Sequence, residues 1–341
     1  MGVKYLKNIT ELLGNEEGRY FSNGFKHMDC SYENLCYQNK VFSGDVIVGY
    51  KWNEKETRHL HVGTAEYVAI ASVICEQMLS AEFYLTPEEI TYCWIDYFKT
   101  KIQTSVELSE NTKIQVLGKL ISTKKIDNTN KYKSLFEIKV STTLIKISAI
   151  HPHNGNPDLS LNPLVKIDKS HIYYTGYKMR RHLIENVMLN NKLMLCTASV
   201  SIENSYLRKA GISSKYDGTL LTDIILISGQ LTQALFYSIQ KLDRNTGGNI
   251  WVRDIEVSMN EPNERLKYDV ELLFTDIKTL EKKDEVWKSI QLISNLGGIS
   301  LNVKIVTQIF KKSINEKNCN NRCRPTKQDN VDQCHVLYDR L

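Results

Sequence analysis

Two long segments of this chain are apolar on nearly every side when they are drawn as helices. They are TAEYVAIASVICEQML, residues 64–79, and LTDIILISGQLTQALFYSI, residues 221–239. Neither has the broad polar face of a surface helix. We therefore expect two helices buried on all sides, whose few polar side chains must find partners.

Alternating apolar and polar positions predict strands around each helix. The short candidates DVIVGY and LMLCTASV precede the helices. The candidates that follow are TKIQVLGKLIS and LFEIKVSTTLIKI in the first half, and WVRDIEVSM, LKYDVELLFTDI, VWKSIQLI and ISLNVKIVTQI in the second. Each half is expected to contain a strand, a connection, one long helix and about four antiparallel strands.

The two halves also resemble each other. The motif FSNGFK at residues 21–26 recurs as YYTGYK at residues 173–178, displaced by 152 residues. The two apolar helices align at an offset of 157, which pairs Glu66 with Asp223. Loops tolerate insertions, so this difference in offset is compatible with an internal repeat.

The repeat predicts a fold. A helix that is apolar all round needs cover on several sides, whereas an antiparallel sheet offers one apolar face. The economical arrangement is a curved sheet wrapped around the helix, which is the hotdog fold. We expect an α+β double hotdog with an N-terminal repeat at 1–150, a linker at 151–164, a C-terminal repeat at 165–312 and a polar, cysteine-containing tail at 313–341.

The composition and charge of the chain argue against several classes of partner. The chain has 341 residues, and its 42% hydrophobic and 24% charged content is that of a globular protein. The net charge of +5 is a small difference between 44 basic and 39 acidic side chains, so we expect no nucleic-acid partner. The sequence shows neither a membrane-spanning run nor a secretory signal, so we expect a cytoplasmic protein without a membrane partner.

The tail contains Cys319, Cys323, Cys334 and His335. Three thiols and an imidazole could complete a tetrahedral zinc site. Their spacing lacks the tight C-x2-C pair of zinc knuckles, so we expect no bound metal.

Polar residues within the helices are the first candidate site residues. Asp223 and Glu66 lie near helix starts, where a carboxylate either caps the helix or serves a site. Gln230 and Gln233 lie mid-helix, where capping cannot explain them. We expect these two amides to hydrogen-bond a ligand or a facing loop.

The helix faces can be assigned at 100° per residue. One face of the second helix carries Ile225, Gly229, Thr232 and Phe236, and the matching face of the first carries Val68, Ser72, Cys75 and Leu79. Because Gly229 and Ser72 are small, we expect this face to pack directly on the strands. Asp223 and Gln230 share roughly the opposite face, which should look toward something polar.

The segment WVRDIEVSM places a charge on an apolar face. Strict alternation puts Arg253 on the same side as Trp251, and Asp96 occupies the matching position in the first half. A buried arginine needs a carboxylate or a bound anion. We expect an ion pair with Asp223 or Asp96, and a ligand contact is the alternative.

His59 and His61 precede the first helix. A neutral imidazole at that place could act as a general base. The matching positions of the second half are Tyr216 and Gly218, as expected for one active and one degenerate site. Two surface histidines are the alternative interpretation.

Several segments resemble one family. YLKNITELLGNEEGRYFSNGFK, YYTGYKMRRHLIENV, ISGQLTQALFY and NIWVRD, spread from Tyr5 to Phe310, resemble the AvrD family of bacterial proteins. The resemblance implies a role in making syringolides, acyl glycosides assembled from a β-ketoacyl chain and a ketopentose such as xylulose. The family is also similar to A-factor synthesis enzymes, which are hotdog proteins that lead to butenolides.

The resemblance implies a synthase of acyltransferase type. The acyl donor would be a thioester of acyl carrier protein or coenzyme A, the acceptor a sugar or sugar phosphate, and no other cofactor is expected. A homodimer is one option for assembly. We assign catalysis to His59, Glu66, Asp223 and Arg253, and substrate binding to His61, Asp96, Gln230, Gln233 and Trp251.

Three further functions compete with this assignment. Hotdog dehydratases carry an acid four residues before a Gln-Ala pair, and here Gly229 occupies that position before Gln233 and Ala234. The first-half counterpart is Ser72, which weakens a dehydratase interpretation. A hotdog thioesterase and a non-catalytic acyl- or butenolide-binding protein stay open as hypotheses.

Overall fold

The computed structural model describes residues 2–50, 61–104, 106–108, 111–152, 164, 166–167, 169–205, 210–242, 250–282 and 285–310. In these residues, 13 strands form one antiparallel sheet in the order β1-β8-β9-β11-β12-β13-β10-β4-β7-β6-β5-β3-β2. This arrangement confirms an α+β protein built on a large antiparallel sheet. Of the expected linker, residues 151 and 152 close the strand β7, and most of the rest lies outside the described residues.

The elements follow one another in two similar series. The first is β1 (Val3–Asn8), α1 (Thr10–Leu13), the 3₁₀ helix η1 (Gly24–His27), β2 (Met28–Gln38), β3 (Val41–Tyr50), α2 (Thr64–Phe83), α3 (Pro87–Thr91), β4 (Trp94–Lys101), β5 (Thr112–Lys125), β6 (Lys131–Val140) and β7 (Thr143–Pro152). The second is the 3₁₀ helix η2 (Gly176–Met179), β8 (Arg180–Asn190), β9 (Leu195–Asn204), α4 (Leu221–Gln240), β10 (Ile250–Ser258), β11 (Lys267–Lys282), β12 (Glu285–Leu296) and β13 (Ile299–Phe310).

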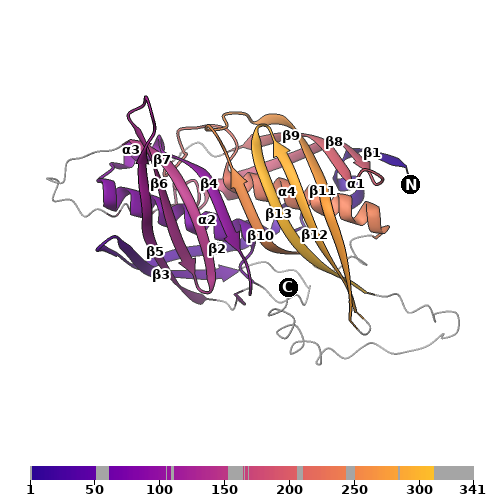
Figure 1. The fold of residues 1–341 in the computed structure, drawn as a ribbon, viewed down its shortest axis with the longest axis horizontal. Coiled ribbons are helices and arrows are strands. Elements are labelled where there is room, and N and C mark those ends of the chain that lie inside the picture. The colour runs from indigo at the N-terminus through magenta and orange to yellow at the C-terminus, as the bar shows by residue number, and fades with distance from the viewer. Residues whose placement is uncertain are drawn as a thin grey trace.

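The strand order in the two series corresponds one for one. The first series contributes β4-β7-β6-β5-β3-β2, and the second contributes β10-β13-β12-β11-β9-β8. The halves join where β4 pairs with β10, with Phe98 opposite Val257. Figure 1 shows α2 behind the strands of one half and α4 behind the strands of the other. A single continuous sheet therefore carries both long helices.

Both long helices are largely buried, and α2 almost completely so. Every residue of α2 except Glu82 is buried. This helix packs on β5, β6 and β7 and also contacts α4. The cover agrees with a sequence that offers no polar face. The start of the chain crosses over to the other half, because β1 pairs with β8, with Leu6 opposite Val187.

Two details of the strands differ from the sequence-based expectation. The segment 135–147 was expected as one strand, but a turn with Ser141 at φ 54° divides it between β6 and β7. Strands β1, β2 and β8 were not expected. The registers of β2 and β8 shift between Glu33 and Cys36 and between Glu185 and Met188, and such bulges break the alternation that marks a strand.

The face of α4 that carries Gly229 also differs from the prediction, which had it packed directly on strands. A Cβ at Gly229 would lie 2.6 Å from the ring of Phe21. Phe21 belongs to the segment between α1 and η1, not to a strand. The glycine therefore makes room for a loop side chain.

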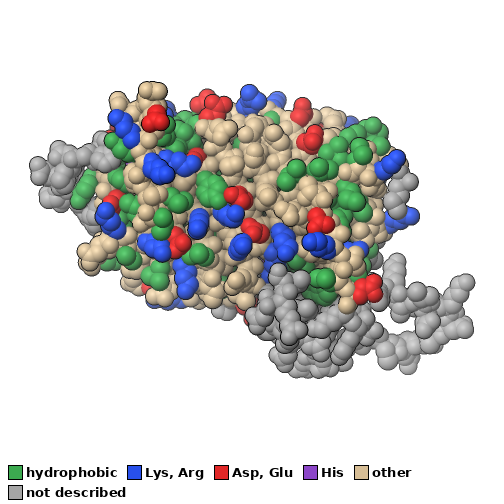
Figure 2. Space-filling model, viewed as in Figure 1, with side chains coloured by type: hydrophobic (Ala, Val, Ile, Leu, Met, Phe, Trp, Pro, Cys, Tyr) green, Lys and Arg blue, Asp and Glu red, His purple; other side chains and the backbone are tan. Residues whose placement is uncertain are grey.

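The outer surface mixes charge types. Figure 2 shows basic and acidic side chains interspersed with apolar ones on the face drawn. Lys99 lies 2.8 Å from Glu256, and Lys119 lies 2.7 Å from Glu137. None of the described helices is both long and apolar enough to cross a membrane.

Candidate functional site

The first turn of α2 holds a buried carboxyl group. Glu66 is the third residue after the N-cap Gly63, and its exposure is 0%. The backbone N–H groups of Glu66 itself and of Gly63 favour its ionised form, and the Tyr20 hydroxyl donates a hydrogen bond to Oε2. Oε1 meets no partner among the described residues. One carboxyl oxygen thus remains free to accept a proton.

The glycine at the N-cap lets Tyr20 reach Glu66. A Cβ at Gly63 would collide with the Tyr20 hydroxyl and lie 2.5 Å from Glu66 Oε2. The backbone of Gly63 is extended, with φ −83° and ψ 170°. Space, and not backbone conformation, therefore requires glycine at this position.

The surroundings of Glu66 shift its proton affinity. Burial raises the pKa of Glu66 to about 7, although the Tyr20 hydroxyl, the two backbone N–H groups and the charge of Lys178 act in the opposite direction. Lys178, on η2, donates from Nζ to the carbonyl of Met28. A carboxyl group that titrates near neutral pH can both accept and deliver a proton there.

Cys30 lies in the same neighbourhood but offers no nucleophile. Burial raises its pKa to about 12, and Lys178 lowers that pKa only in part. The thiol stays protonated at neutral pH, and the thiol form is a poor nucleophile. Glu66 is consequently the group in this cluster that is suited to proton transfer.

The matching carboxyl of the second half has a different environment. Asp223 occupies the third position of α4 and accepts the N–H of Leu220 at 2.8 Å. Arg180 contacts both of its oxygens, at 3.0 and 2.9 Å, and His182 Nε2 lies 2.8 Å from Oδ1. Burial favours a raised pKa, but Arg180, His182 and Leu220 together outweigh it and hold the pKa of Asp223 below its ordinary value. Asp223 is therefore both a cap and an ion-pair partner.

The repeat explains this difference between the halves. Strands β2 and β8 start directly after the two 3₁₀ helices. The 152-residue displacement matches Met28 with Arg180 and Cys30 with His182. The second half thus places two basic side chains where the first half places an apolar side chain and a neutral thiol. Glu66 is left without the partners that neutralise Asp223.

Two predicted substrate-binding residues, His61 and Trp251, lie together just before the first turn of α2. The rings of His61 and Trp251 have centroids 4.8 Å apart. His61 also forms a β-bridge with Glu107 and lies two residues before Gly63. His59 lies outside the described residues.

The two mid-helix amides, Gln230 and Gln233, differ in their hydrogen bonding. Gln230 Oε1 accepts from Arg19 at 3.2 Å and from Ser22 at 2.9 Å, and its Nε2 donates to the carbonyl of Phe21 at 3.3 Å. Its partners belong to a facing loop, which was one of the two expectations. Gln233 is half-buried and makes no hydrogen bond to a described residue.

The predicted ion pair of Arg253 with Asp223 or Asp96 is wrong, and the alternative, a ligand contact, stays a prediction. Arg253 is the bulge residue of β10, where the register against β13 shifts, and it is only half-buried. Its guanidinium donates to the carbonyls of Ile102 and Gln103, at 3.4 and 3.1 Å. The expected pairing with Asp223 does not form, because the bulge interrupts the strict alternation on which it rested.

Asp96 is likewise a bulge residue, in β4. Its carboxylate lies 2.5 Å from the hydroxyl of Ser148 and 2.5 Å from Lys133 Nζ. Asp96 thus has its own cation and does not pair with Arg253, in contrast to the second option that the sequence offered.

A second buried acid–imidazole contact could not be found from the sequence, because its members lie on different halves. Glu76 Oε2 lies 2.8 Å from His171 Nε2 and accepts the N–H of Ile212 at 2.6 Å. His171 Nδ1 accepts the N–H of Tyr173 at 3.1 Å, which assigns the ring proton to Nε2. This contact ties α2 to the segment that precedes η2.

Tyr20, Lys178 and Arg180 were also missed. The alternation of Arg180 and His182 within MRRHL was the available signal for a basic strand face.

The described residues contain no group of three or more His, Cys, Asp or Glu side chains that could hold a metal ion. The cysteines of the tail lie outside those residues.

The ion pair beneath α4 generates a stability prediction. Replacing Arg180 by Met should lower the free energy of unfolding by ~3–5 kcal/mol, because Asp223 would stay buried without its main cation. Urea unfolding measures this change. Arg181→Met is the matched control: Arg181 is 56% exposed, so its loss should change stability by at most about 1 kcal/mol. Equal effects of the two substitutions would contradict the assignment.

The raised pKa of Glu66 generates a pH prediction. Between pH 4.5 and about 7 the folded state binds a proton that the unfolded state has lost. The contribution of Glu66 to stability therefore falls as the pH rises through this window, by at most ~3 kcal/mol. In urea unfolding, the free energy of unfolding of Glu66→Gln should therefore rise relative to that of the wild type as the pH is raised from 5 to 8.

Glu82→Gln, at a partly exposed position of the same helix, is the matched control for that experiment. A stability difference between the wild type and Glu66→Gln that stays constant from pH 5 to pH 8 would show that Glu66 is not perturbed by burial.

Several solved structures are similar to this chain over most of its length at low sequence identity. A TesB protein from Mycobacterium avium subsp. paratuberculosis has 10% identity and a TM-score of 0.37, covering 82% of this chain and 96% of that one. A hot dog fold protein of unknown function from Alicyclobacillus acidocaldarius has 7% identity and a TM-score of 0.36, covering 80% and 95%. An acyl-CoA thioesterase II from Mycobacterium marinum has 8% identity and a TM-score of 0.34, covering 81% and 96%.

These TM-scores are too low to support any functional argument. No curated protein matches the chain by sequence. The family described as Pseudomonas avirulence D protein (AvrD), in contrast, matches residues 4–309, which is nearly the whole chain. The chain therefore belongs to the AvrD family.

Proposed function

We propose that this AvrD-family chain is an enzyme that transfers a β-ketoacyl group from a thioester to a hydroxyl group of a ketose such as xylulose. One observation carries the proposal: Glu66 is fully buried, has a pKa of about 7 and keeps one oxygen unpartnered among the described residues. A general base works best when its pKa lies near the operating pH. Family membership supports the class of substrate.

The fold proposal is that each half is a hotdog unit, so that the chain is a double hotdog. The matching strand orders of the two halves support it. In such a duplicated protein, one copy can keep an active site while the other becomes structural. The contrast between Glu66 and the neutralised Asp223 supports an active first copy.

In the proposed reaction, ionised Glu66 removes the proton of a sugar hydroxyl through its free Oε1. The sugar oxygen attacks the carbonyl carbon of the thioester, and a C–O bond forms. When the tetrahedral intermediate collapses, the C–S bond breaks and the leaving thiolate takes up the proton that Glu66 holds. The products are an acyl ester of the sugar and a free thiol, and closure of that ester could lead to a butenolide-type or syringolide-type signal.

Positive potential near Glu66 would stabilise the oxyanion of the intermediate. The start of α2 presents N–H groups and the positive end of the helix dipole. Lys178 adds a cation whose side chain is 11% exposed. Tyr20 would act as a positioning residue, since its hydroxyl holds Oε2 and leaves Oε1 free.

The acyl chain would lie along the face of α2 that starts at Glu66. Ile70 and Val73 continue this face, and Gln77 returns to within ~20° of Glu66, roughly 16 Å along the helix axis. Gln77 is fully buried, and neither polar atom of its amide has a partner among the described residues. An unpaired buried amide is unfavourable, so Gln77 would meet a polar group or water at the far end of this path.

The donor in this proposal is a thioester of acyl carrier protein or coenzyme A, and the acceptor is a sugar or sugar phosphate. No further cofactor takes part in the steps above. His61 and Trp251 would contact the substrate beside the start of α2, where their rings already lie together. A homodimer is compatible with the proposal but not needed for it.

The activity test uses purified full-length protein with a β-ketoacyl coenzyme A and xylulose. Mass spectrometry detects the acyl sugar, and a thiol reagent detects coenzyme A release. Glu66→Gln should lower kcat/KM by about 10²–10⁴-fold, and Glu82→Gln should not. The wild-type kcat/KM should fall below pH 7, because protonated Glu66 cannot act as a base.

Three other outcomes of this test would contradict the proposed acyl transfer. Thiol release that proceeds equally without sugar indicates a thioesterase. Tight binding of the thioester without turnover indicates a non-catalytic acyl-binding protein. No binding and no consumption across several chain lengths and ketoses would rule out an acyl-thioester function.

A further inference from the structure

A pocket opens where the sheet of the first half is incomplete. Strand β5 begins at Thr112, but its neighbour β6 pairs with it only from Val116 onward. The turn between β6 and β7 closes across this end, where the N–H of Ser141 donates to the carbonyl of Gln115 at 3.0 Å. The first residues of β5 therefore have a strand partner only on the β3 side.

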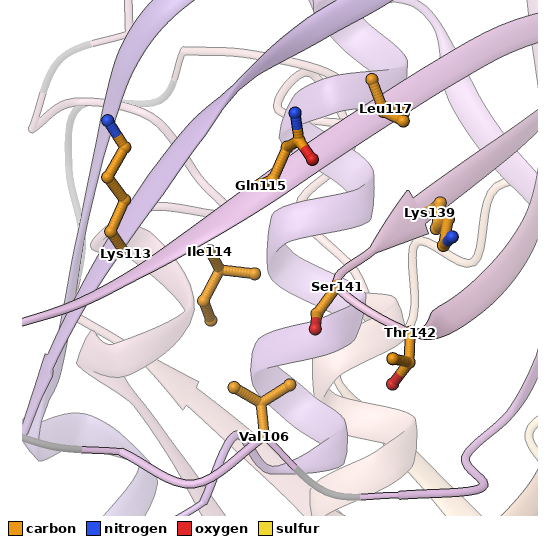
Figure 3. A pocket seen from close by; sticks show the side chains of 8 residues that line it. All are labelled: Val106, Lys113, Ile114, Gln115, Leu117, Lys139, Ser141 and Thr142. Atoms are coloured by element: carbon orange, nitrogen blue, oxygen red, sulfur yellow. The ribbon is translucent and has the colours of Figure 1, made fainter.

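This gap forms a pocket of about 270 Å³. Its volume is below that of a site for a complete drug-sized ligand, but it can hold a compact polar group. Figure 3 shows Lys113 and Lys139 on opposite sides of the pocket, with Ser141 between them. Val106 and Ile114 supply an apolar wall.

The polar groups around the pocket are almost all hydrogen-bond donors or hydroxyls. The lining includes two ammonium groups, the Gln115 amide and the hydroxyls of Ser141 and Thr142, and its described residues include no carboxylate. Lys139 makes no ion pair with a described residue, whereas Lys113 lies 3.0 Å from Asp45. Lys139 is thus the cation that remains available to an anion.

The pocket also lies close to the start of α2. The carbonyl of Val106, in its wall, accepts the N–H of Val62 at 3.0 Å, and Val62 directly precedes the N-cap Gly63. Tyr67, the residue after Glu66, is fully buried. Its hydroxyl lies beside Thr143 and the backbone of Val106, but neither meets it with hydrogen-bond geometry. The wall of the pocket is thus joined by one hydrogen bond to the residue that precedes the N-cap of α2.

We propose that this pocket binds a phosphate ester, with Lys139 and the hydroxyls of Ser141 and Thr142 as its principal contacts. Ammonium and hydroxyl donors around a compact space suit the charge and the acceptor oxygens of a phosphate group. The inference rests on the proposed function, in which either substrate can carry such a group. The phosphate belongs either to the pantetheine arm of the acyl donor or to a phosphorylated ketose acceptor.

Calorimetric titration of the full chain distinguishes these sources. The probes are coenzyme A, phosphate-free pantetheine, xylulose and xylulose 5-phosphate. Lys139→Met keeps the aliphatic stem and removes the charge. It should therefore lower the affinity of the protein for the phosphorylated ligand by about ten-fold. If the donor supplies the phosphate, Lys139→Met binds coenzyme A more weakly than the wild type does, and binds pantetheine equally well. If the acceptor supplies it, xylulose 5-phosphate loses affinity and xylulose does not.

Lys146→Met is the matched control. Lys146 is an exposed lysine on the neighbouring strand β7, makes no ion pair with a described residue and does not line the pocket. The expected result is a loss of affinity in Lys139→Met alone, with unchanged thermal unfolding in both variants. Equal affinities of the wild type, Lys139→Met and Lys146→Met for both phosphorylated probes would overturn the proposal.

The reaction itself is tested separately with an S-acyl pantetheine and xylulose, neither of which carries a phosphate. Turnover of these substrates that depends on Glu66, together with no effect of Lys139→Met on any phosphorylated probe, would refute the pocket and leave the proposed chemistry intact. A Lys139-dependent affinity, with no turnover of either these substrates or a β-ketoacyl coenzyme A with xylulose 5-phosphate, would support the pocket and refute the chemistry.

Discussion

A carboxyl group buried at the start of a helix must either be neutralised by a cation or hold its proton more tightly. This constraint separates the two halves of the molecule. Asp223 is neutralised by Arg180 and also contacts His182, so its charge serves to fix β8 against α4. Glu66 has Tyr20 as its side-chain donor, and its pKa rises to about 7. The same position is therefore structural in one half and suited to proton transfer in the other.

The two halves also complete each other. The segment before η1 crosses to α4, where Arg19 bonds Gln230, and the segment before η2 crosses to α2, where His171 bonds Glu76. Glycines make room at both crossings, because a Cβ at Gly229 or Gly211 would press on Phe21 or His171. The environment of Glu66 thus depends on both halves, with Tyr20 from one and Lys178 from the other. Separating the repeats would be expected to dismantle the site.

Sequence reasoning could locate α2 and α4 because their apolar positions leave no polar face, and most strands because their side chains alternate. It failed where geometry breaks periodicity. The bulges in β2 and β8 hide two strands, and the bulge at Arg253 removes that residue from the core face on which alternation had placed it. Glu66 could be selected from its position, whereas Tyr20 is 46 residues away in sequence. Contacts of that kind depend on packing that no local pattern encodes.

The central claim is that Glu66 titrates near neutral pH because it is buried without a dedicated cation. Infrared difference spectroscopy of the wild type against Glu66→Gln, from pH 4 to pH 9, measures this titration directly through the carboxyl and carboxylate stretching bands. The account predicts a carboxyl band that is present in the wild type, absent from Glu66→Gln and lost with a midpoint near pH 7. A midpoint near pH 4.5, the ordinary value for a glutamate, would contradict the account.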